Sequence, residues 1–460
     1  MFIEPHNIKT AMRKYCQVLI LCISTIGYNV TSSAASDLPN VIIFFADDAG
    51  YADFGFQGSE IHVTPNIDFL AKHGVVFSQA YASSSVCSPS RAGLLTGRYQ
   101  NRFGMEFNLP HVGSNHLASD MPGLPLSEVT IADLVKSKGY ATAMIGKWHL
   151  GATDEFLPDS RGFDEYFGVM GGSSGYRTGT AKNVISNYLE VKSKSLPYLT
   201  DAFGDQAVDF IRNNKEQPFF LYFAFTAPHG PMHAKSEYLE KFLDKTEDPR
   251  RAANAALTRS MDDNIGKVLK VLKDFDLYDN TFVIFANDNG GEPSKNGASN
   301  SPLNGVKGTV LEGGIKIPLI FHWSNRITGN QLYNYPVTTL DVLPTVMNAI
   351  GADINVEIDG VDLLPYIGGE NHHSPHETLY WRVNWGAAIR DGDWKLIRTP
   401  KNENRLFNLA NDPEEIENLI EMFPDKAASS KQKLLVWEGS LPEPKWEPKE
   451  FWKKSAASLY

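Results

Sequence analysis

The sequence predicts an α/β fold, with a large mixed, mostly parallel sheet sandwiched by helices and a small C-terminal α+β subdomain. Two observations carry this prediction. Short, continuous apolar runs, which suit strands buried on both faces, alternate with segments of helical periodicity. Several of these runs also stop abruptly at charged or metal-binding residue types. Ligands of open α/β sheets lie beyond the carboxyl ends of the strands, so the run ends predict a functional site.

Four apolar runs are predicted to be strands of the main sheet. They cover residues 41–45, 141–145, 219–225 and 282–286. The polar residues that follow them are, in the same order, Asp47 and Asp48, Lys147 and His149, His229, and Asp288 and Asn289. Because the carboxyl ends of parallel strands meet at one edge of a sheet, these side chains are expected to converge.

Helical patterns lie between these runs, at residues 65–73, 130–138, 252–275 and 338–350. After about Gly369 the pattern changes to strands at 378–383 and 387–399, the second interrupted by the hairpin signal Asp391-Gly392, and a helix at 424–437. We therefore divide the chain into a signal peptide (1–35), a main domain (36–370) and a C-terminal antiparallel-sheet subdomain (371–460).

The N-terminus is typical of an export signal. Arg13 and Lys14 precede an apolar run at residues 16–28, and small residues follow, so cleavage is expected after Ala35. An uncleaved anchor is the alternative, and a lipoprotein signal at Cys22 is disfavoured because small residues do not precede it. The mature protein is expected to be exported, periplasmic or secreted, without a membrane segment once the signal is removed.

Charge and cysteine content narrow the function. The formal net charge of -11 argues against a general nucleic-acid or anionic-membrane binder, although a few local cations could still bind an anionic substrate. Of the three cysteines, Cys16 and Cys22 lie in the signal run, so Cys87 would remain without an intramolecular partner. A lone thiol in an oxidising compartment is buried, paired between chains or chemically used.

The most specific motif begins at Cys87 and ends at Gly97. Pro89 suits the first turn of a helix, which would place Cys87 at a helix N-terminus, where free amides and the dipole favour anions. Arg91, four residues on, would face the same side. A nucleophile, a cation and a helix N-terminus together indicate an oxyanion site. A buried structural cysteine beside a surface arginine is the alternative.

Cys-x-Pro-Ser-Arg followed by Leu-x-Thr-Gly resembles the signature of the type I sulfatases, members of the alkaline phosphatase superfamily, and further matches run from about Asn40 to Gly314. The sequence looks closest to polysaccharide- and N-acetylgalactosamine-directed sulfatases. The resemblance implies that a formylglycine-generating or equivalent maturation enzyme oxidises Cys87 to Cα-formylglycine. Arg91 and a metal would hold the hydrated aldehyde of that residue, which would attack sulfate.

A metal site is expected at the ends of the first and last runs. Carboxylate and amide oxygens suit calcium or magnesium. The resemblance matches Asp47, Asp48, Asp288, Asn289 and the side chain at position 87 to the family's metal ligands. It makes one Ca²⁺ per chain the first choice.

The resemblance also gives roles to four further residues. Lys147, in Gly-Lys-Trp-His, would bind the sulfate, and His149 would contact the formylglycine diol and help the sulfated intermediate collapse. His229, in Ala-Pro-His, would bind the sulfate and help protonate the leaving alcohol. Lys307, before Glu-Gly-Gly, matches the second sulfate-binding lysine.

The expected activity is that of a sulfuric ester hydrolase acting on a sulfated polysaccharide or oligosaccharide, such as a carrageenan-like galactan or a glycosaminoglycan. Ser174, Tyr176, Arg177 and His233 are candidate substrate contacts, although a plain flexible loop at 171–177 and a simple turn at His233 fit as well. Two alternatives are a phosphoesterase of the same superfamily and a non-catalytic protein that binds sulfated glycans. The complete motif set disfavours both.

Overall fold

The computed structural model describes residues 38–110, 122–187, 189–383, 386–448 and 456–460. The signal peptide expected at residues 1–35 lies outside the described residues. Among the helices that are described, none combines the length and apolar character needed to cross a membrane. The α/β prediction is confirmed.

Among the described residues the main sheet has ten strands, and the four predicted apolar runs form the neighbouring parallel set in its middle. In spatial order the strands are β11 (Gln331–Tyr333), β2 (Val75–Phe77), β10 (Leu319–His322), β9 (Thr281–Asn287), β1 (Asn40–Ala46), β8 (Phe219–Ala224), β4 (Ala141–Lys147), β5 (Glu165–Val169), β6 (Val184–Ser186) and β7 (Leu189–Glu190). β10, β6 and β7 pair antiparallel with their neighbours, which makes the sheet mixed.

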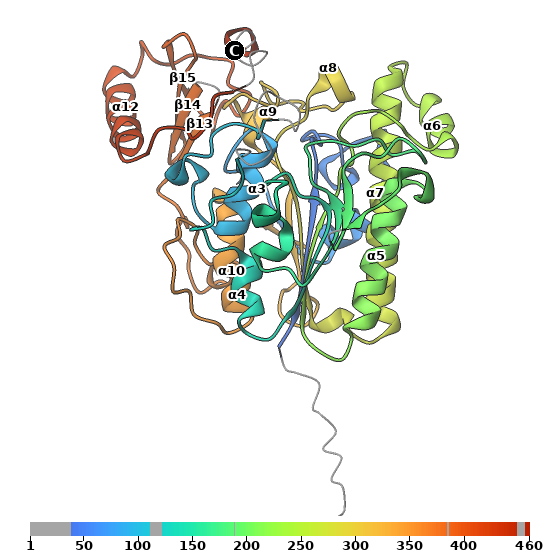
Figure 1. Cartoon of the computed structure of the whole chain (residues 1–460). Coiled ribbons are helices and arrows are strands. Elements are labelled where there is room, and N and C mark those ends of the chain that lie inside the picture. The colour runs from blue at the N-terminus through green and yellow to red at the C-terminus, as the bar shows by residue number, and fades with distance from the viewer. Residues whose placement is uncertain (1–37, 111–121, 188, 384–385, 449–455) are drawn as a thin grey trace, which may run out of the picture. The chain divides into compact units, whose positions relative to one another are not determined.

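Helices cover both faces of this sheet (Figure 1). α3 (Cys87–Thr96), α4 (Ile131–Lys136) and α10 (Val342–Ala349) pack on one face, and α2 (Pro65–Lys72), α5 (Leu199–Asn213), α6 (Ser236–Leu243) and α7 (Pro249–Asp274) pack on the other. β1 shows why its run is apolar throughout: Val41, Ile43 and Phe45 point into one core, whereas Ile42 and Phe44 point into the other. All five are fully buried.

The predicted helices differ from the observed ones mainly at their ends. The pattern at 338–350 begins with a 3-10 turn, Thr339–Asp341, before α10. The pattern at 130–138 yields only α4, whose capping box joins Thr130 and Asp133. The other α-helices described before residue 370 are short: α8 (Pro293–Asn296), α9 (Glu312–Ile315) and α11 (Leu364–Ile367). A two-stranded sheet pairs β3 (Ala80–Tyr81) with β12 (Val337–Thr338).

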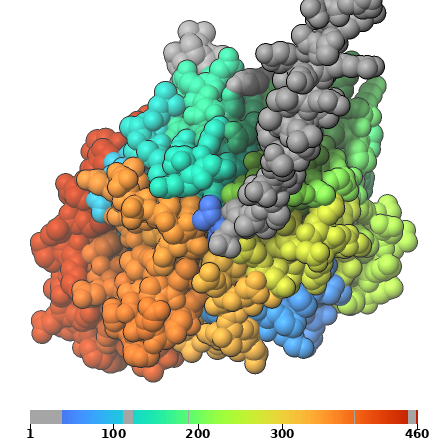
Figure 2. Space-filling view, turned by 90° about the horizontal axis from the view of Figure 1, so that it is seen from below, coloured from blue at the N-terminus to red at the C-terminus, as the bar shows by residue number. Residues whose placement is uncertain are grey.

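The C-terminal part forms a four-stranded antiparallel sheet, β13 (Thr378–Val383), β14 (Gly386–Asp391), β15 (Trp394–Arg398) and β16 (Asn404–Asn408), followed by α12 (Pro424–Gly439). One face packs against α12 and the other against α9 and its preceding loop. Figure 2 shows these residues, in red, beside the orange segment and away from the yellow-green α7. The domain boundary at residue 370 stays a prediction.

A buried ionic cluster joins this sheet to the main domain. The ammonium group of Lys395 in β15 lies 2.8 Å from carboxylate oxygens of both Glu312 in α9 and Glu415. The side chains of all three residues are at most 1 % exposed. Burial, only partly offset by Lys395, raises the pKa of Glu415 to about 7. A further hydrogen bond runs from the Tyr81 hydroxyl to Glu312 at 2.7 Å.

His376 forms an ion pair with a buried carboxylate. Its Nε2 lies 2.8 Å from Oδ1 of Asp341, a buried carboxylate that also accepts hydrogen bonds from the amides of Thr338 and Val361. Burial alone would lower the pKa of His376, but the charge of Asp341 outweighs it, and the pKa is raised from its usual 6.5.

Because the folded-state pKa is raised, His376 stabilises the fold fully below about pH 6.5, and this contribution is lost as pH rises through the folded-state pKa. We expect His376→Gln to reduce the free energy of unfolding most at acidic pH and progressively less above neutrality. Urea denaturation at several pH values measures this, with the exposed His372→Gln as control. A stability difference that does not change with pH would contradict the assignment.

Candidate active site

Three carboxylates and an amide cluster where β1 and β9 end. Asp47 and Asp48 follow β1, and Asp288 and Asn289 follow β9, its parallel neighbour. One ligand atom from each of Asp47, Asp48, Asp288 and Cys87 lies within 4.8 Å of the others. All four residues are buried. The parallel register, which pairs Ala46 with Asn287, is what brings these residues together.

Two residues of this region have left-handed backbone conformations that L side chains rarely adopt. Asp48 has φ 60° and His149 has φ 59°. Such conformations cost of order 1–3 kcal/mol and concentrate at functional sites. Before His149, Gly146 has φ 109°, and a Cβ there would lie 1.8 Å from the carbonyl oxygen of Ala224. Only glycine therefore allows β4 to deliver Lys147 and His149 beside β8.

Cys87 is the first residue of α3 and is 1 % exposed. Its Sγ lies 3.7 Å from Oδ1 of Asp47, 3.8 Å from Oδ1 of Asp48, and 3.0 Å from Nζ of Lys307. Burial raises the pKa of the thiol to about 12, even though two lysines lie nearby. The thiol is therefore protonated at neutral pH and, unmodified, is a poor nucleophile.

Arg91 lies one helical turn beyond Cys87, facing the same site. Its guanidinium is fully buried and lies 2.8 Å from Asp288 and 3.5 Å from Asp47. It also donates to the carbonyl oxygen of Lys147 at 3.1 Å and lies over the ring of Phe45, 5.4 Å from the centroid. Arg91 therefore connects α3 to the ends of β1, β4 and β9.

Two lysines complete the cation set. Nζ of Lys147 lies 2.7 Å from Asp47, and Nζ of Lys307 lies 2.6 Å from Asp48. Their side chains are 0 % and 4 % exposed. Three buried carboxylates thus face three buried cations. Lys307 contacts both Asp48 and Cys87, so it lies where an oxyanion attached at position 87 would need a positive partner.

The three carboxylates differ in how far neighbouring cations offset the effect of burial on their pKa values. Burial raises the pKa of Asp47 to about 8, despite Lys147 and Arg91. Burial would also raise the pKa of Asp288 and of Asp48, but Arg91 and Lys147 lower the first, and Lys307 and His229 lower the second. Crowded buried carboxylates of this kind bind cations.

The donor set fits a hard divalent cation. Oδ1 of Asn289 is buried and has no hydrogen-bond partner among the described residues, whereas its Nδ2 donates to Asp48 at 2.7 Å and to the carbonyl oxygen of Gly290 at 2.9 Å. An oxygen left unpartnered beside three carboxylates is a ready metal ligand. Oxygen donors favour calcium or magnesium over softer metals.

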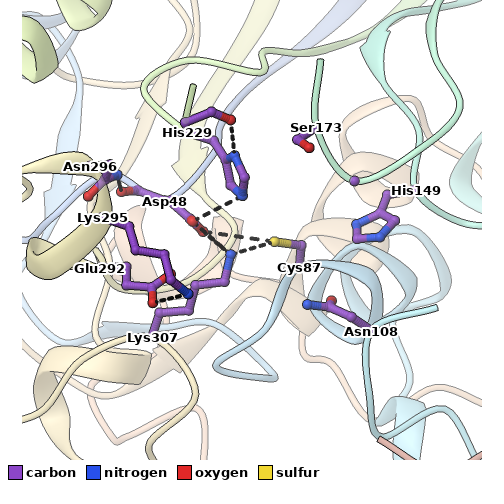
Figure 3. A pocket seen from close by; sticks show the side chains of 12 residues that line it. Asp48, Cys87, Asn108, His149, Ser173, His229, Glu292, Lys295, Asn296 and Lys307 are labelled. Atoms are coloured by element: carbon purple, nitrogen blue, oxygen red, sulfur yellow. Dashed lines mark hydrogen bonds and ion pairs between the residues drawn. The ribbon is translucent and has the colours of Figure 1, made fainter. Parts of the chain in front are cut away.

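The two predicted histidines lie on different sides of Cys87 (Figure 3). Nε2 of His229 lies 3.5 Å from Asp48, and its Nδ1 contacts the carbonyl oxygen of Gly230 at 2.6 Å. Burial lowers the pKa of His229 to about 4, against the charge of Asp48, so the ring is neutral at pH 7. His149 lies near Cys87 on the opposite wall.

A cavity of about 350 Å³ opens onto these groups. Its lining also includes Ser173, from the predicted loop at 171–177, and Asn108, Glu292, Lys295 and Asn296, which were not predicted from the sequence. Asn108 accepts a hydrogen bond from the amide of Ser88, at the start of α3. Lys295 of α8 lies 2.6 Å from a carboxylate oxygen of Glu292, the residue before that helix. The signal that could have found this pair is its position, a few residues beyond Asp288 and Asn289.

The four candidate substrate contacts lie around the cavity rather than among the described residues that line it. Tyr176 is 1 % exposed, and its hydroxyl donates to the carbonyl oxygens of Thr226 and His229, which supports the loop that carries His229. Ser174 hydrogen-bonds to the backbone of Lys182. Arg177 reaches the carbonyl oxygen of Ala234, and His233 is half-buried. Their contact with substrate stays a prediction.

Comparison with protein families gives two matches. Residues 39–352 match the family model described as Sulfatase, and residues 306–435 match the one described as N-sulphoglucosamine sulphohydrolase, C-terminal. The chain is 32% identical over 441 residues to N-acetylgalactosamine-6-sulfatase from Rattus norvegicus, covering 91% of this chain and 80% of the relative. It is 33% identical to arylsulfatase A from Homo sapiens, covering 80% and 75%.

Solved structures of similar fold include that of Ps i-CgsB in complex with k-i-k-neocarrahexaose, at a TM-score of 0.83 and 36% identity, covering 90% of this chain and 96% of that one. A phosphonate monoester hydrolase of Agrobacterium radiobacter gives a TM-score of 0.65 at 18% identity, covering 87% and 95%. At that identity the second likeness shows the fold alone. The shared fold therefore does not by itself distinguish sulfate from phosphorus esters.

Proposed function

The chain belongs to the sulfatase family and is a sulfuric ester hydrolase, and on this basis we propose that it removes sulfate from a sulfated glycan through a formylglycine formed at Cys87. The single observation that carries the proposal is the surroundings of Cys87. Its Sγ lies 3.0 Å from a buried lysine and less than 4 Å from two buried carboxylates, at the start of a helix.

The modification accounts for a thiol that the site does not activate. With its pKa raised to about 12, the thiol itself would remain protonated. A formylglycine hydrate, formed by a maturation enzyme, supplies two hydroxyls, one to bond to sulfur and one whose proton can be withdrawn to expel sulfate. The Cys-x-Pro-Ser-Arg motif is complete at residues 87–91.

The chain's own cations offset the charge on the transferred sulfuryl group. Arg91 orients position 87 and the carboxylates, and Lys147 and Lys307 neutralise sulfate oxygens as negative charge shifts toward the leaving oxygen. His229, on one side of the cavity, assists departure of the alcohol. An anion bound beside this ring favours its protonated form. His149, on the other side, withdraws the proton that lets sulfate leave.

We propose that Asp47, Asp48, Asp288, Asn289 and position 87 hold one calcium ion. The ion would supply a Lewis acid for the sulfate oxygens and replace Lys147 and Lys307 as the main charge partner of the carboxylates. Both lysines would then be available to the substrate. The unpartnered Oδ1 of Asn289 and the 4.8 Å cluster support this proposal.

The substrate is proposed to be a carrageenan-like galactan or a glycosaminoglycan. Two relatives at more than 30% identity support this class, one named an N-acetylgalactosamine-6-sulfatase and one solved with neocarrahexaose. Such polymers lie outside the cell, which agrees with an export signal at residues 1–35 and a secreted or periplasmic catalytic domain at 36–370. The subdomain at 371–460 is proposed to support that domain.

The proposal is tested by comparing sulfate and phosphate esters of 4-nitrophenol and a panel of sulfated galactan and glycosaminoglycan oligosaccharides. We expect a higher kcat/KM for the sulfate ester than for the phosphate ester, and release of free sulfate from at least one oligosaccharide class. Faster turnover of the phosphate ester would favour the phosphoesterase alternative, which the shared fold permits.

We expect an active preparation to carry an aldehyde at position 87. Mass spectrometry and hydrazide labelling of the peptide spanning residues 86–91 measure this directly. Cys87→Ser should reduce turnover to background while leaving the circular dichroism spectrum and the unfolding midpoint unchanged, because serine replaces sulfur without changing the shape of the site. An active preparation whose position 87 is an unmodified thiol would refute the formylglycine proposal.

Metal binding is tested by Asp288→Asn, which keeps the shape of the side chain and removes one ligand charge. We expect about one calcium per wild-type chain by elemental analysis. Calcium at about 100 times its Kd should raise the free energy of unfolding of the wild type by about 2.7 kcal/mol. The variant should show neither effect, whereas Asp274→Asn, at the exposed end of α7, should behave as wild type. Equal calcium content in Asp288→Asn would count against this ligand set.

A further inference from the structure

A second cavity adjoins the one that contains Cys87, and the chemistry proposed above does not use it. Its volume is about 300 Å³, close to the 350 Å³ of the first. His149, Gly172 and Ser173 line both cavities, so the two spaces share one wall. Figure 3 shows His149 and Ser173 together on one side of Cys87, away from Lys295 and Glu292.

Gly172 keeps this shared wall thin. A Cβ at this position would lie 2.8 Å from both Cε1 and Nε2 of His149. Any larger residue would therefore push the His149 ring out of place or fill the junction between the cavities. With glycine there, the backbone passes directly over a ring that lines both spaces. A ligand group in the second cavity would consequently face the first cavity across the His149 ring.

The chemistry of the second cavity suits an anionic sugar. Leu109, Pro110 and Met170 form an apolar part of its lining, and Lys182 lies beside them. Lys182 is exposed, and no carboxylate of the described residues pairs with its ammonium group. Apolar side chains pack against the C–H faces of a pyranose ring, and an unpaired ammonium binds a sulfate or carboxylate group.

Backbone hydrogen bonds hold the two walls of this cavity together. The amide of Met170 donates to the carbonyl oxygen of Asn183 at 3.1 Å. The amide of Lys182 donates to Oγ of Ser174 at 2.8 Å, and that hydroxyl donates back to the carbonyl oxygen of Lys182 at 3.2 Å. Ser174, a predicted substrate contact, thus positions the backbone of Lys182 instead of lining either cavity.

We propose that the second cavity binds the sugar next to the one that loses sulfate, and that Lys182 binds a sulfate or carboxylate group on this neighbouring sugar. The inference rests on the proposed function and adds the minimum size and the charge of the substrate. The substrate is an anionic oligosaccharide of at least two sugars, bound across His149. Simple aryl sulfates occupy the first cavity only.

The test compares Lys182→Ala with Lys194→Ala, which removes the same charge from an exposed lysine that lines neither cavity. The substrates are an ι-carrageenan tetrasaccharide, a chondroitin 6-sulfate tetrasaccharide and 4-nitrophenyl sulfate. For whichever tetrasaccharide the wild type desulfates, we expect Lys182→Ala to lower kcat/KM about tenfold or more, as loss of one charged hydrogen bond does. Turnover of 4-nitrophenyl sulfate should be unchanged, and Lys182→Arg should restore the oligosaccharide rate.

A second variant blocks the cavity without changing charge. Gly171 lines only the second cavity, and a Cβ there has 3.6 Å to its nearest neighbour, Nδ2 of Asn183. We expect Gly171→Phe to lower oligosaccharide turnover selectively. Equal oligosaccharide rates in the wild type and both variants would overturn the second sugar site. The site would also be overturned if the wild type hydrolysed 4-nitrophenyl sulfate but neither tetrasaccharide. Absence of sulfate release from all three substrates by formylglycine-containing wild type would refute the proposed function itself.

Discussion

Burial of three carboxylates at the ends of two neighbouring strands is the constraint on which the rest of the site depends. Asp47, Asp48 and Asp288 are each at most 2 % exposed. Carboxylates removed from water are strongly unfavourable unless cations or hydrogen bonds compensate them. The fold supplies Arg91 from α3, Lys147 from β4 and Lys307 from a loop after β9. The burial of these carboxylates therefore requires the same three cations that the candidate site brings together.

The same requirement extends to the C-terminal sheet. Lys307 belongs to a loop that leads directly into α9, where Glu312 is held by Lys395 of β15. The amide of Gly308 in that loop also donates to the carbonyl oxygen of Ser85, just before Cys87. Removing Lys395 would leave two buried carboxylates unpaired beside this loop, a change that typically costs about 3–5 kcal/mol. The C-terminal sheet thus stabilises the loop that positions Lys307.

The features that could be predicted from the sequence are those that depend on the pattern of neighbouring residues. The parallel centre of the sheet was predictable because strands such as β1 are apolar on both faces. The clustering of Asp47, Asp48 and Asp288 was predictable because these residues stand directly after two of those strands. Short strands such as β2, with three residues, carry no periodic signal and were missed. Long-range contacts were missed for another reason. The bond from Tyr176 to the carbonyl oxygen of His229 joins positions 53 residues apart, and no spacing rule connects them.

The charge balance of the site bears on how a chain of net charge -11 could act on the proposed polyanionic substrate. Surface charges more than about 8 Å away are largely screened at physiological ionic strength, so the field at the pocket is set by the groups around it. With all three carboxylates ionised, Arg91, Lys147 and Lys307 only bring that cluster to neutrality. A divalent cation held by the carboxylates would leave a surplus of two positive charges, and both lysines would be free to face the substrate. Affinity for an anionic ester would then depend on metal occupancy more than on the net charge of the protein.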